Sequence, residues 1–99
     1  MRYEFPYELT RDGAGFWLVT FPDVPEAGTD DPDREIALAE AADSLIAALG
    51  GYVEAGRPIP TPRVPSALSG MPRPAIALPP LVAAKLALAD AKVRAGLSN

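Results

Sequence analysis

The stretch FWLVTFPDVPEAGTDDPDREIALAEAADSLIAALGGYVEAGRPIP, residues 16–60, decides the fold. It begins with a run of aromatic and β-branched residues and then changes to an apolar pattern that repeats every three to four residues. The first pattern favours a strand, and the second is typical of an amphipathic helix. We therefore expect a strand followed by a helix whose apolar stripe packs on the sheet.

The expected helix begins at Asp31-Pro32, because an aspartate can accept hydrogen bonds from the free amides of the first turn and proline fits the first helical position. Its predicted buried stripe consists of Leu38, Ala42, Leu45, Leu49 and Val53, with Ile46 beside it. Gly50-Gly51 interrupts this stripe, and each glycine costs about 1 kcal/mol in a helix interior relative to alanine. We expect the last turn to be frayed or kinked and Gly56 to end the helix.

The residues before this stretch predict a strand that pairs with it. Aromatic and apolar side chains in residues 3–9 occupy every second position, as in a strand that buries one face. Pro6 cannot donate a ladder hydrogen bond, so this strand is expected at a sheet edge or paired there only through its other residues. Asp12-Gly13 supplies the turn into residues 16–21, which gives a hairpin. Residues 27–30 are expected to return as a short third strand.

The composition changes after the first helix. Six prolines fall within residues 57–74 and predict an extended linker. Residues 75–78 could add a strand, and Pro79-Pro80 then opens a second helix over residues 81–94, with Gly96 as its left-handed cap. This helix is too apolar to stand alone in water. It could be covered by the first domain, by another copy of the chain, or by the remainder of a larger unit of which it is the first helix, and the sequence favours the third.

Length and composition exclude several classes of protein. A chain of 99 residues that is 48% apolar is expected to form a small globular domain. No run reaches the ~20 apolar residues of a membrane span, and no basic segment at the N-terminus precedes a long apolar run, so we expect a cytoplasmic protein away from the membrane. The absence of cysteine and histidine excludes disulfides, zinc fingers and Ser-His triads. No metal and no cofactor are expected.

The formal charge of −4 conceals two parts of opposite sign. Residues 1–56 hold twelve of the thirteen carboxylates and carry a net charge of −9, whereas residues 57–99 carry +5. A negative field repels the phosphates of nucleic acid and attracts basic partners. The first part is therefore expected to meet a basic protein, or, in the plainer interpretation, to keep the chain soluble.

The order and spacing of these motifs resemble the HicB family of bacterial antitoxins over residues 3–62. The resemblance rests on the tyrosine-rich first strand, the Phe-Pro-Asp motif of residues 21–23, the acidic helix start and the Arg-Pro-Ile-Pro exit of residues 57–60. Residues 26–28, at the start of the expected third strand, depart from the family pattern. Alone, each motif is common; their order makes the resemblance specific.

A second resemblance concerns the end of the chain. Residues 81–98 are similar to the start of the helix-turn-helix that follows many HicB domains, with Ser98-Asn99 as the cap of the next helix. That next helix would enter the DNA major groove, and the sequence stops before it. Whether the chain is a fragment or a native protein without this reader stays open.

The resemblance implies an α+β chain with three parts. These are a partial ribonuclease-H-like β-β-β-α-β domain over residues 1–60, a Pro-rich linker over residues 61–74, and a strand plus helix over residues 75–99 as a truncated helix-turn-helix segment for DNA binding or dimerisation. The implied function is that of a type II antitoxin, which neutralises a basic HicA toxin that cleaves messenger RNA and represses its own operon through operator DNA. A homodimer or tetramer is expected. The alternative is an orphan HicB-like scaffold or ligand-binding oligomer without a toxin.

Two sets of charged residues are the candidate contacts. The expected toxin-binding residues are Asp23, Glu26, Asp30, Asp31, Asp33 and Glu35. The expected DNA contacts are Lys85, Lys92 and Arg94. Each set also has a plainer explanation, since Asp beside Pro stabilises turns, carboxylates at a helix start favour the helix dipole, and three basic residues without a recognition helix form a solvated strip.

A ribonuclease-H-like fold also raises the hypothesis of two-metal catalysis, in which neighbouring carboxylates hold Mg²⁺ ions. The candidates would be Glu8, Asp23, Asp30 and Asp43. Asp43 is expected on the outward face of the first helix, Asp23 lies in a Pro-flanked turn, and no motif sets a ligand spacing. We therefore expect a binding protein and not an enzyme.

Overall fold

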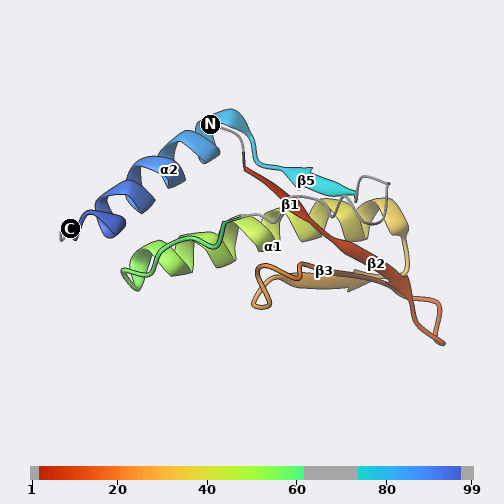
Figure 1. The fold of residues 1–99 in the computed structure, drawn as a ribbon. Helices are drawn as coiled ribbons and strands as arrows, with labels where there is room; N and C mark the ends of the chain where they lie inside the picture. Colours follow the sequence, from red (N-terminus) through yellow and green to blue (C-terminus); the bar gives the residue numbers. More distant parts are fainter. Residues whose placement is uncertain (1–2, 62–73, 97–99) are drawn as a thin grey trace, which may run out of the picture.

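The computed structural model describes residues 3–61 and 74–96, which form an α+β fold (Figure 1). The strands are β1 (Glu4–Pro6), β2 (Glu8–Arg11), β3 (Trp17–Thr20), β4 (Gly28–Asp31) and β5 (Ala75–Ala77). The helices are α1 (Arg34–Glu54) and α2 (Pro80–Arg94). The predicted α+β class is confirmed, as are the short third strand β4 and the strand β5.

The strands form two antiparallel sheets, and β1 of the first sheet leads directly into β2 of the second. β2 pairs with β3 and β3 with β4, whereas β1 pairs with β5. The predicted single strand over residues 3–9 is therefore wrong, because the chain changes its partner at Tyr7, whose amide donates to the Pro74 carbonyl (3.1 Å). Pro6, which has no N–H to donate, is the last residue of β1 and lies beside this change of partner.

The predicted hairpin between β2 and β3 is confirmed. In its turn, Oδ1 of Asp12 accepts hydrogen bonds from the amides of Ala14 and Phe16, both at 2.9 Å. Gly15 follows with a φ of +90°, a left-handed conformation that other residues rarely adopt. The Asp-Gly-Ala-Gly sequence thus fixes the turn through one side chain and one glycine.

α1 begins two residues later than predicted. Asp33 is its N-cap, and the Asp33 carboxylate accepts from the Ile36 amide at 3.0 Å. Asp31 belongs to β4, where it pairs with Trp17, and its Oδ1 accepts from the Asp33 amide at 2.8 Å. Either aspartate of the Asp31-Pro32-Asp33 sequence can cap a helix. Because Asp31 is paired in β4, Asp33 caps α1 and Pro32 lies between strand and helix.

The buried stripe of α1 is rotated from the predicted one. Its buried residues are Ala37, Ala41, Leu45, Leu49 and Tyr52. The predicted Leu38, Ala42 and Val53 are only partly buried, because the alanines, and not the larger residues beside them, face the sheet. The helix continues through Gly50-Gly51, so the expected frayed end is wrong, while Gly56 ends the helix with a φ of +69° as predicted.

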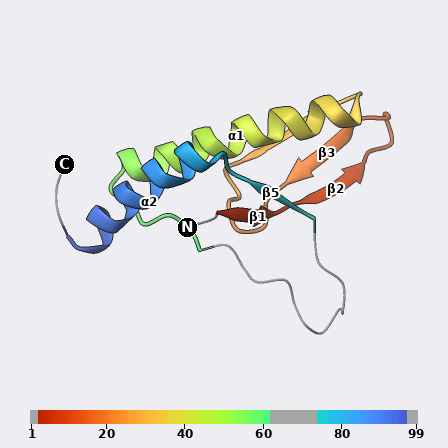
Figure 2. The same cartoon turned by 90° about the horizontal axis from the view of Figure 1, so that it is seen from above.

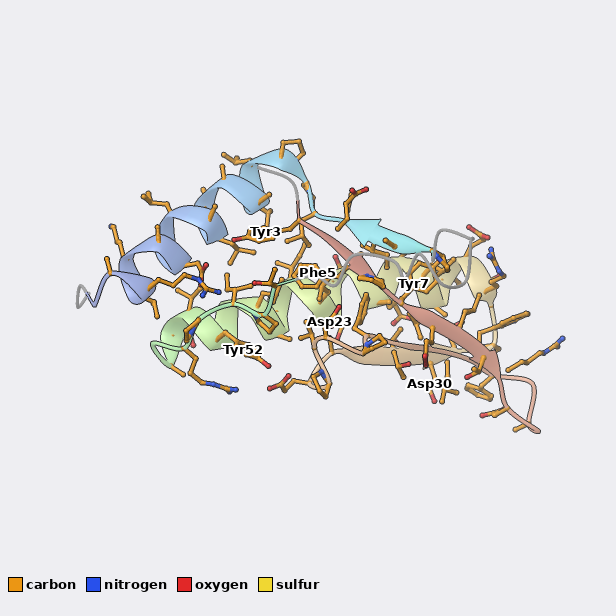
Figure 3. All side chains as sticks on the ribbon, viewed as in Figure 1. Tyr3, Phe5, Tyr7, Asp23, Asp30 and Tyr52 are labelled. Atoms are coloured by element: carbon orange, nitrogen blue, oxygen red, sulfur yellow. The ribbon has the colours of Figure 1, made fainter. Side chains whose placement is uncertain are left out.

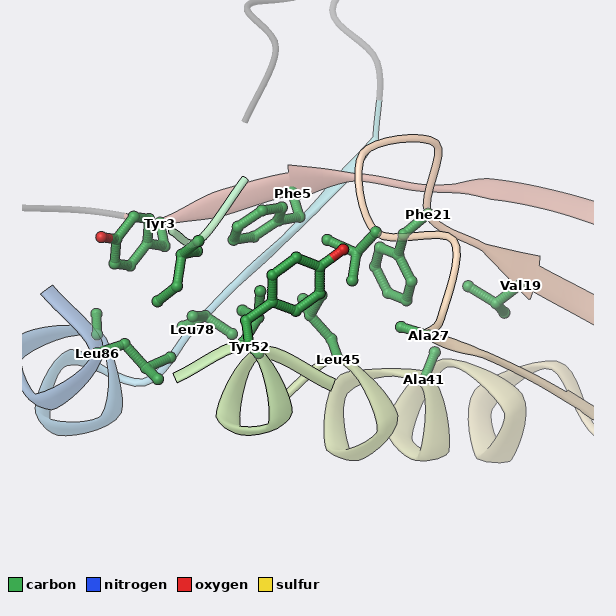
Figure 4. Packing of buried hydrophobic residues seen from close by; sticks show 14 of the residues in the cluster. Tyr3, Phe5, Val19, Phe21, Ala27, Ala41, Leu45, Tyr52, Leu78 and Leu86 are labelled. Carbon is green, nitrogen blue, oxygen red and sulfur yellow. The ribbon is translucent and has the colours of Figure 1, made fainter. Parts of the chain in front are cut away.

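One core joins the strands to both helices. The largest fully buried side chains include Phe5, Phe21, Leu45, Leu49 and Ile59. Figure 4 shows the labelled Phe5 and Phe21 between the strands and α1. Burying a side chain of this size contributes about 1.5–3 kcal/mol. This contact between sheet and helix is therefore the main source of stability.

Among the described residues, α1 is the one helix whose length and composition would allow it to cross a membrane. The core helix of a soluble protein passes the same test, so this is weak evidence for a membrane span. In this fold, the buried face of α1 packs on the sheet.

α2 packs beside α1, as Figure 2 shows. Ala83 and Leu86 are buried in the shared core, whereas Leu81 and Leu88 are 67% and 62% exposed. Of the three expected covers of α2, packing on the first domain is thus observed. The side of α2 that carries Leu81 and Leu88 stays exposed. The Pro-rich residues 62–73 and the proposed cap Ser98-Asn99 lie outside the described residues, and the division at residues 60 and 74 stays a prediction.

A buried carboxylate ties α2 to the segment that leaves α1. Oδ1 of Asp90 accepts from the Ile59 amide at 2.8 Å, and Oδ2 accepts from Nε of Arg94 at 2.7 Å. Nη2 of Arg94 then donates to the Ile59 carbonyl at 2.9 Å. The Asp90 side chain is only 12% exposed, where charge-assisted hydrogen bonds are strong. We call these three residues the Asp90 clamp.

We expect Asp90→Ala to lower the free energy of unfolding by about 2–3 kcal/mol, because it leaves the Ile59 amide and Nε of Arg94 without their acceptor. Urea unfolding followed by circular dichroism measures this. Asp43→Ala, an exposed position on α1, is the control and should change the free energy by less than about 0.5 kcal/mol. Equal unfolding midpoints for Asp90→Ala and the wild type would contradict the clamp.

Candidate functional site

The largest group of carboxylates lies where β4 passes into α1. Its members are Asp30, Asp31, Asp33, Glu35, Glu40 and Asp43. Four of the six predicted toxin-binding residues therefore do lie close together. The basic residue in this group is Arg34, and its Nη1 pairs with Oε1 of Glu35 at 2.8 Å. The surface of this group is therefore strongly negative.

Glu40, which the sequence did not single out, reports this negative field. Partial desolvation raises the pKa of Glu40 above its ordinary value, and the hydrogen bond and charge of Asp31 raise it further, with smaller contributions from Asp30 and Asp43. When protonated, Glu40 can donate a hydrogen bond to the Asp31 carboxylate. The negative charges around Glu40 therefore favour its protonated form.

Most carboxylates of this group already have a partner within the chain. Asp31 accepts from the Asp33 amide, Asp33 accepts from the Ile36 amide, and Glu35 pairs with Arg34. Asp31 and Asp33 thus accept hydrogen bonds at the start of α1, where carboxylates also favour the helix dipole. Asp30 and Asp43 differ, because their exposed side chains make no such contact among the described residues.

Glu26 lies far from this group, near the opposite end of α1. The Tyr52 hydroxyl donates to both carboxylate oxygens of Glu26 at 2.8 Å. Nη1 of Arg57 lies 3.9 Å from Oε2 of Glu26, and the Arg57 guanidinium stacks over the Tyr52 ring. The Tyr52 hydrogen bond lowers the pKa of Glu26 and raises that of Tyr52. Along α1, Tyr52 is about 27 Å from Arg34, and Figure 3 shows Tyr52 and Asp30 well apart.

Asp23 lies in the tight turn between β3 and β4. The Val24 amide donates to the Phe21 carbonyl and the Ala27 amide to the Val24 carbonyl, both at 3.0 Å. Asp23 is half-buried, and Figure 3 shows it apart from Asp30. The six predicted toxin-binding residues are thus spread over the strand-to-helix corner, this turn and the far end of α1.

The four candidate metal ligands come from different elements. Glu8 lies in β2, Asp23 in the turn after β3, Asp30 in β4 and Asp43 on the exposed side of α1. Within residues 3–61 and 74–96, no group of three or more acidic residues is placed to hold a metal ion.

The predicted DNA contacts divide into two kinds. Lys85 and Lys92 are exposed on α2 and form no ion pair with any described residue. Arg94 is half-exposed, but its guanidinium is held by Asp90 and by the Ile59 carbonyl. The signal that could have found this clamp is the position of Asp90, the sole acidic residue after residue 56.

Comparison with known proteins identifies relatives of the chain. Residues 4–87 match the family model described as a HicB_like antitoxin of bacterial toxin-antitoxin systems. The chain is 38% identical over all 99 residues to Antitoxin HicB 2 of Photorhabdus laumondii subsp. laumondii and spans 65% of that protein. It is 45% identical over 62 residues, 63% of the chain, to Antitoxin HicB 1 of the same bacterium, with 39% of that protein covered. Both matches span less than two thirds of the relative.

We expect Glu40→Gln to stabilise the protein at pH 7 and to have little effect near pH 4. A carboxyl whose folded pKa is raised contributes stability that is present below its unfolded pKa and is lost as the pH rises through the folded pKa. Thermal unfolding at the two pH values measures the difference. Glu8→Gln removes the same charge on β2 and is the control. A loss of stability at pH 7 in Glu40→Gln would contradict the raised pKa.

Proposed function

Because the chain belongs to the HicB-like antitoxin family, we propose that it is the antitoxin of a type II toxin-antitoxin pair and neutralises a HicA-type toxin. The match of residues 4–87 to the family model carries this proposal. The expected toxin is a small basic ribonuclease that cleaves messenger RNA, and the antitoxin would act by covering its RNA-binding surface. This function belongs in the cytoplasm and needs no catalytic group in the antitoxin.

The charge of the chain supports a basic partner. Residues 1–56 carry a net charge of −9, and a ribonuclease needs basic side chains to hold the phosphates of RNA. Opposite charges raise the rate of association and disfavour wrong partners. The exposed carboxylates of the described residues are therefore complementary in charge to the basic surface by which the toxin would bind RNA.

Operator binding and self-association are assigned to α2 and the residues that follow it. Lys85 and Lys92 are the candidate phosphate contacts because both are exposed and unpaired among the described residues. Arg94 is the weaker candidate, since the Asp90 clamp holds it. Leu81 and Leu88 are seven residues apart on the same side of α2, and a homodimer or tetramer could bury them.

Co-expression with the small basic protein encoded by the adjacent reading frame should restore growth, and the two proteins should co-purify. Because salt screens charges more than about 10 Å apart at 0.1 M, the affinity should fall as the ionic strength rises. Titration calorimetry at several salt concentrations measures this, with an unrelated acidic protein as the control. A lack of binding at low salt would contradict the antitoxin function and favour the orphan scaffold or ligand-binding oligomer.

A further inference from the structure

The two faces of the β2–β3–β4 sheet differ. α1 packs against β3 and β4. Val19 of β3 is fully buried on that side, and Figure 4 shows it between its strand and α1. Because successive side chains of a strand point to opposite faces, Leu18 and Thr20 point away from α1. We call this second side the open face.

The strand register shows which side chains share the open face. Thr10, Leu18 and Asp30 form one row across β2, β3 and β4. Glu8, Thr20 and Gly28 form the next row. Leu18 is half-buried at the centre, and the other residues of both rows are exposed. The open face therefore combines an apolar centre with hydroxyls and carboxylates, and neither row contains a basic residue.

The two carboxylates of this face are unused by the fold. Neither Glu8 nor Asp30 takes part in a hydrogen bond or an ion pair through its side chain among the described residues. The carboxylates of Asp31, Asp33 and Glu26, by contrast, accept hydrogen bonds within the chain. A partner that meets Glu8 and Asp30 therefore breaks no intramolecular contact.

We propose that the open face is the surface on which the basic toxin docks, an assignment that rests on the proposed function. Lysine or arginine side chains of the toxin would meet Glu8 and Asp30, the hydroxyls of Thr10 and Thr20 would supply hydrogen bonds, and Leu18 would pack at the centre. Stable interfaces have this arrangement of an apolar centre within a polar rim.

The competing occupant is a second copy of the chain, which could present Lys85 and Lys92 of α2 to the open face. A second copy carries a net charge of −4, so the two chains repel each other at long range. A basic ribonuclease is attracted over the same distance. The balance of charge therefore favours the toxin.

The test compares two double variants that remove the same charge. Glu8→Gln/Asp30→Asn changes the open face, and Asp43→Asn/Glu54→Gln changes two exposed carboxylates of α1. Titration calorimetry with the toxin should show a Kd at least about tenfold higher for the first and within about twofold of the wild type for the second. Thr20→Lys, which adds a cation to the open face, should also weaken binding about tenfold or more. Circular dichroism checks that each variant is folded.

Each outcome decides the assignment. If the wild type binds the toxin and the two double variants bind equally well or equally poorly, the assignment is overturned while the antitoxin function stands. If Glu8→Gln/Asp30→Asn instead reduces self-association in sedimentation and leaves toxin binding unchanged, the occupant is a second copy and the assignment is overturned. If the wild type fails to bind the toxin at low salt, the proposed function fails together with the assignment.

Discussion

The close contact between α1 and one face of the sheet is the constraint on which the rest of the structure depends. Ala37 and Ala41 are fully buried, and their small side chains let the helix approach the strands. Gly28 of β4 lies close to the neighbouring strand β3, because a Cβ there would lie 3.1 Å from the Val19 carbonyl oxygen. The Gly28 amide also donates to the Ser44 hydroxyl of α1 at 3.1 Å. β4 and α1 are thereby fixed to each other, and α1 covers one face of the sheet.

Two consequences follow for the rest of the chain. The core extends past the sheet to Leu78, Ala83 and Leu86, so the residues after the Pro-rich segment complete the same core. The Asp90 clamp then fixes α2 against the exit from α1. α2 therefore has a defined position relative to the acidic part of the chain.

Much of the fold is predictable from local patterns, and the failures have identifiable causes. Turn residues at Asp12 and Gly56 and the Pro79-Pro80 helix start act within a few residues, so sequence reasoning finds them. The helix cap depends on whether Asp31 is already paired in β4, and the strand break at Tyr7 depends on β5, some seventy residues away. Such long-range pairing carries no local signal. The same limit applies to the candidate site, where the Glu26–Tyr52 bond and the strand register behind the open face appear only once the chain is folded.

The central claim is that α1 occupies one side of the sheet and leaves the other side for the toxin. Methyl NMR spectra recorded while the toxin is added to the isotope-labelled chain test this most directly. The account predicts the largest changes at the methyl groups of Leu18, Thr10 and Thr20, with small changes at Leu81 and Leu88 of α2. Changes confined to α2, or to the outer side of α1 around Ile36, would contradict it.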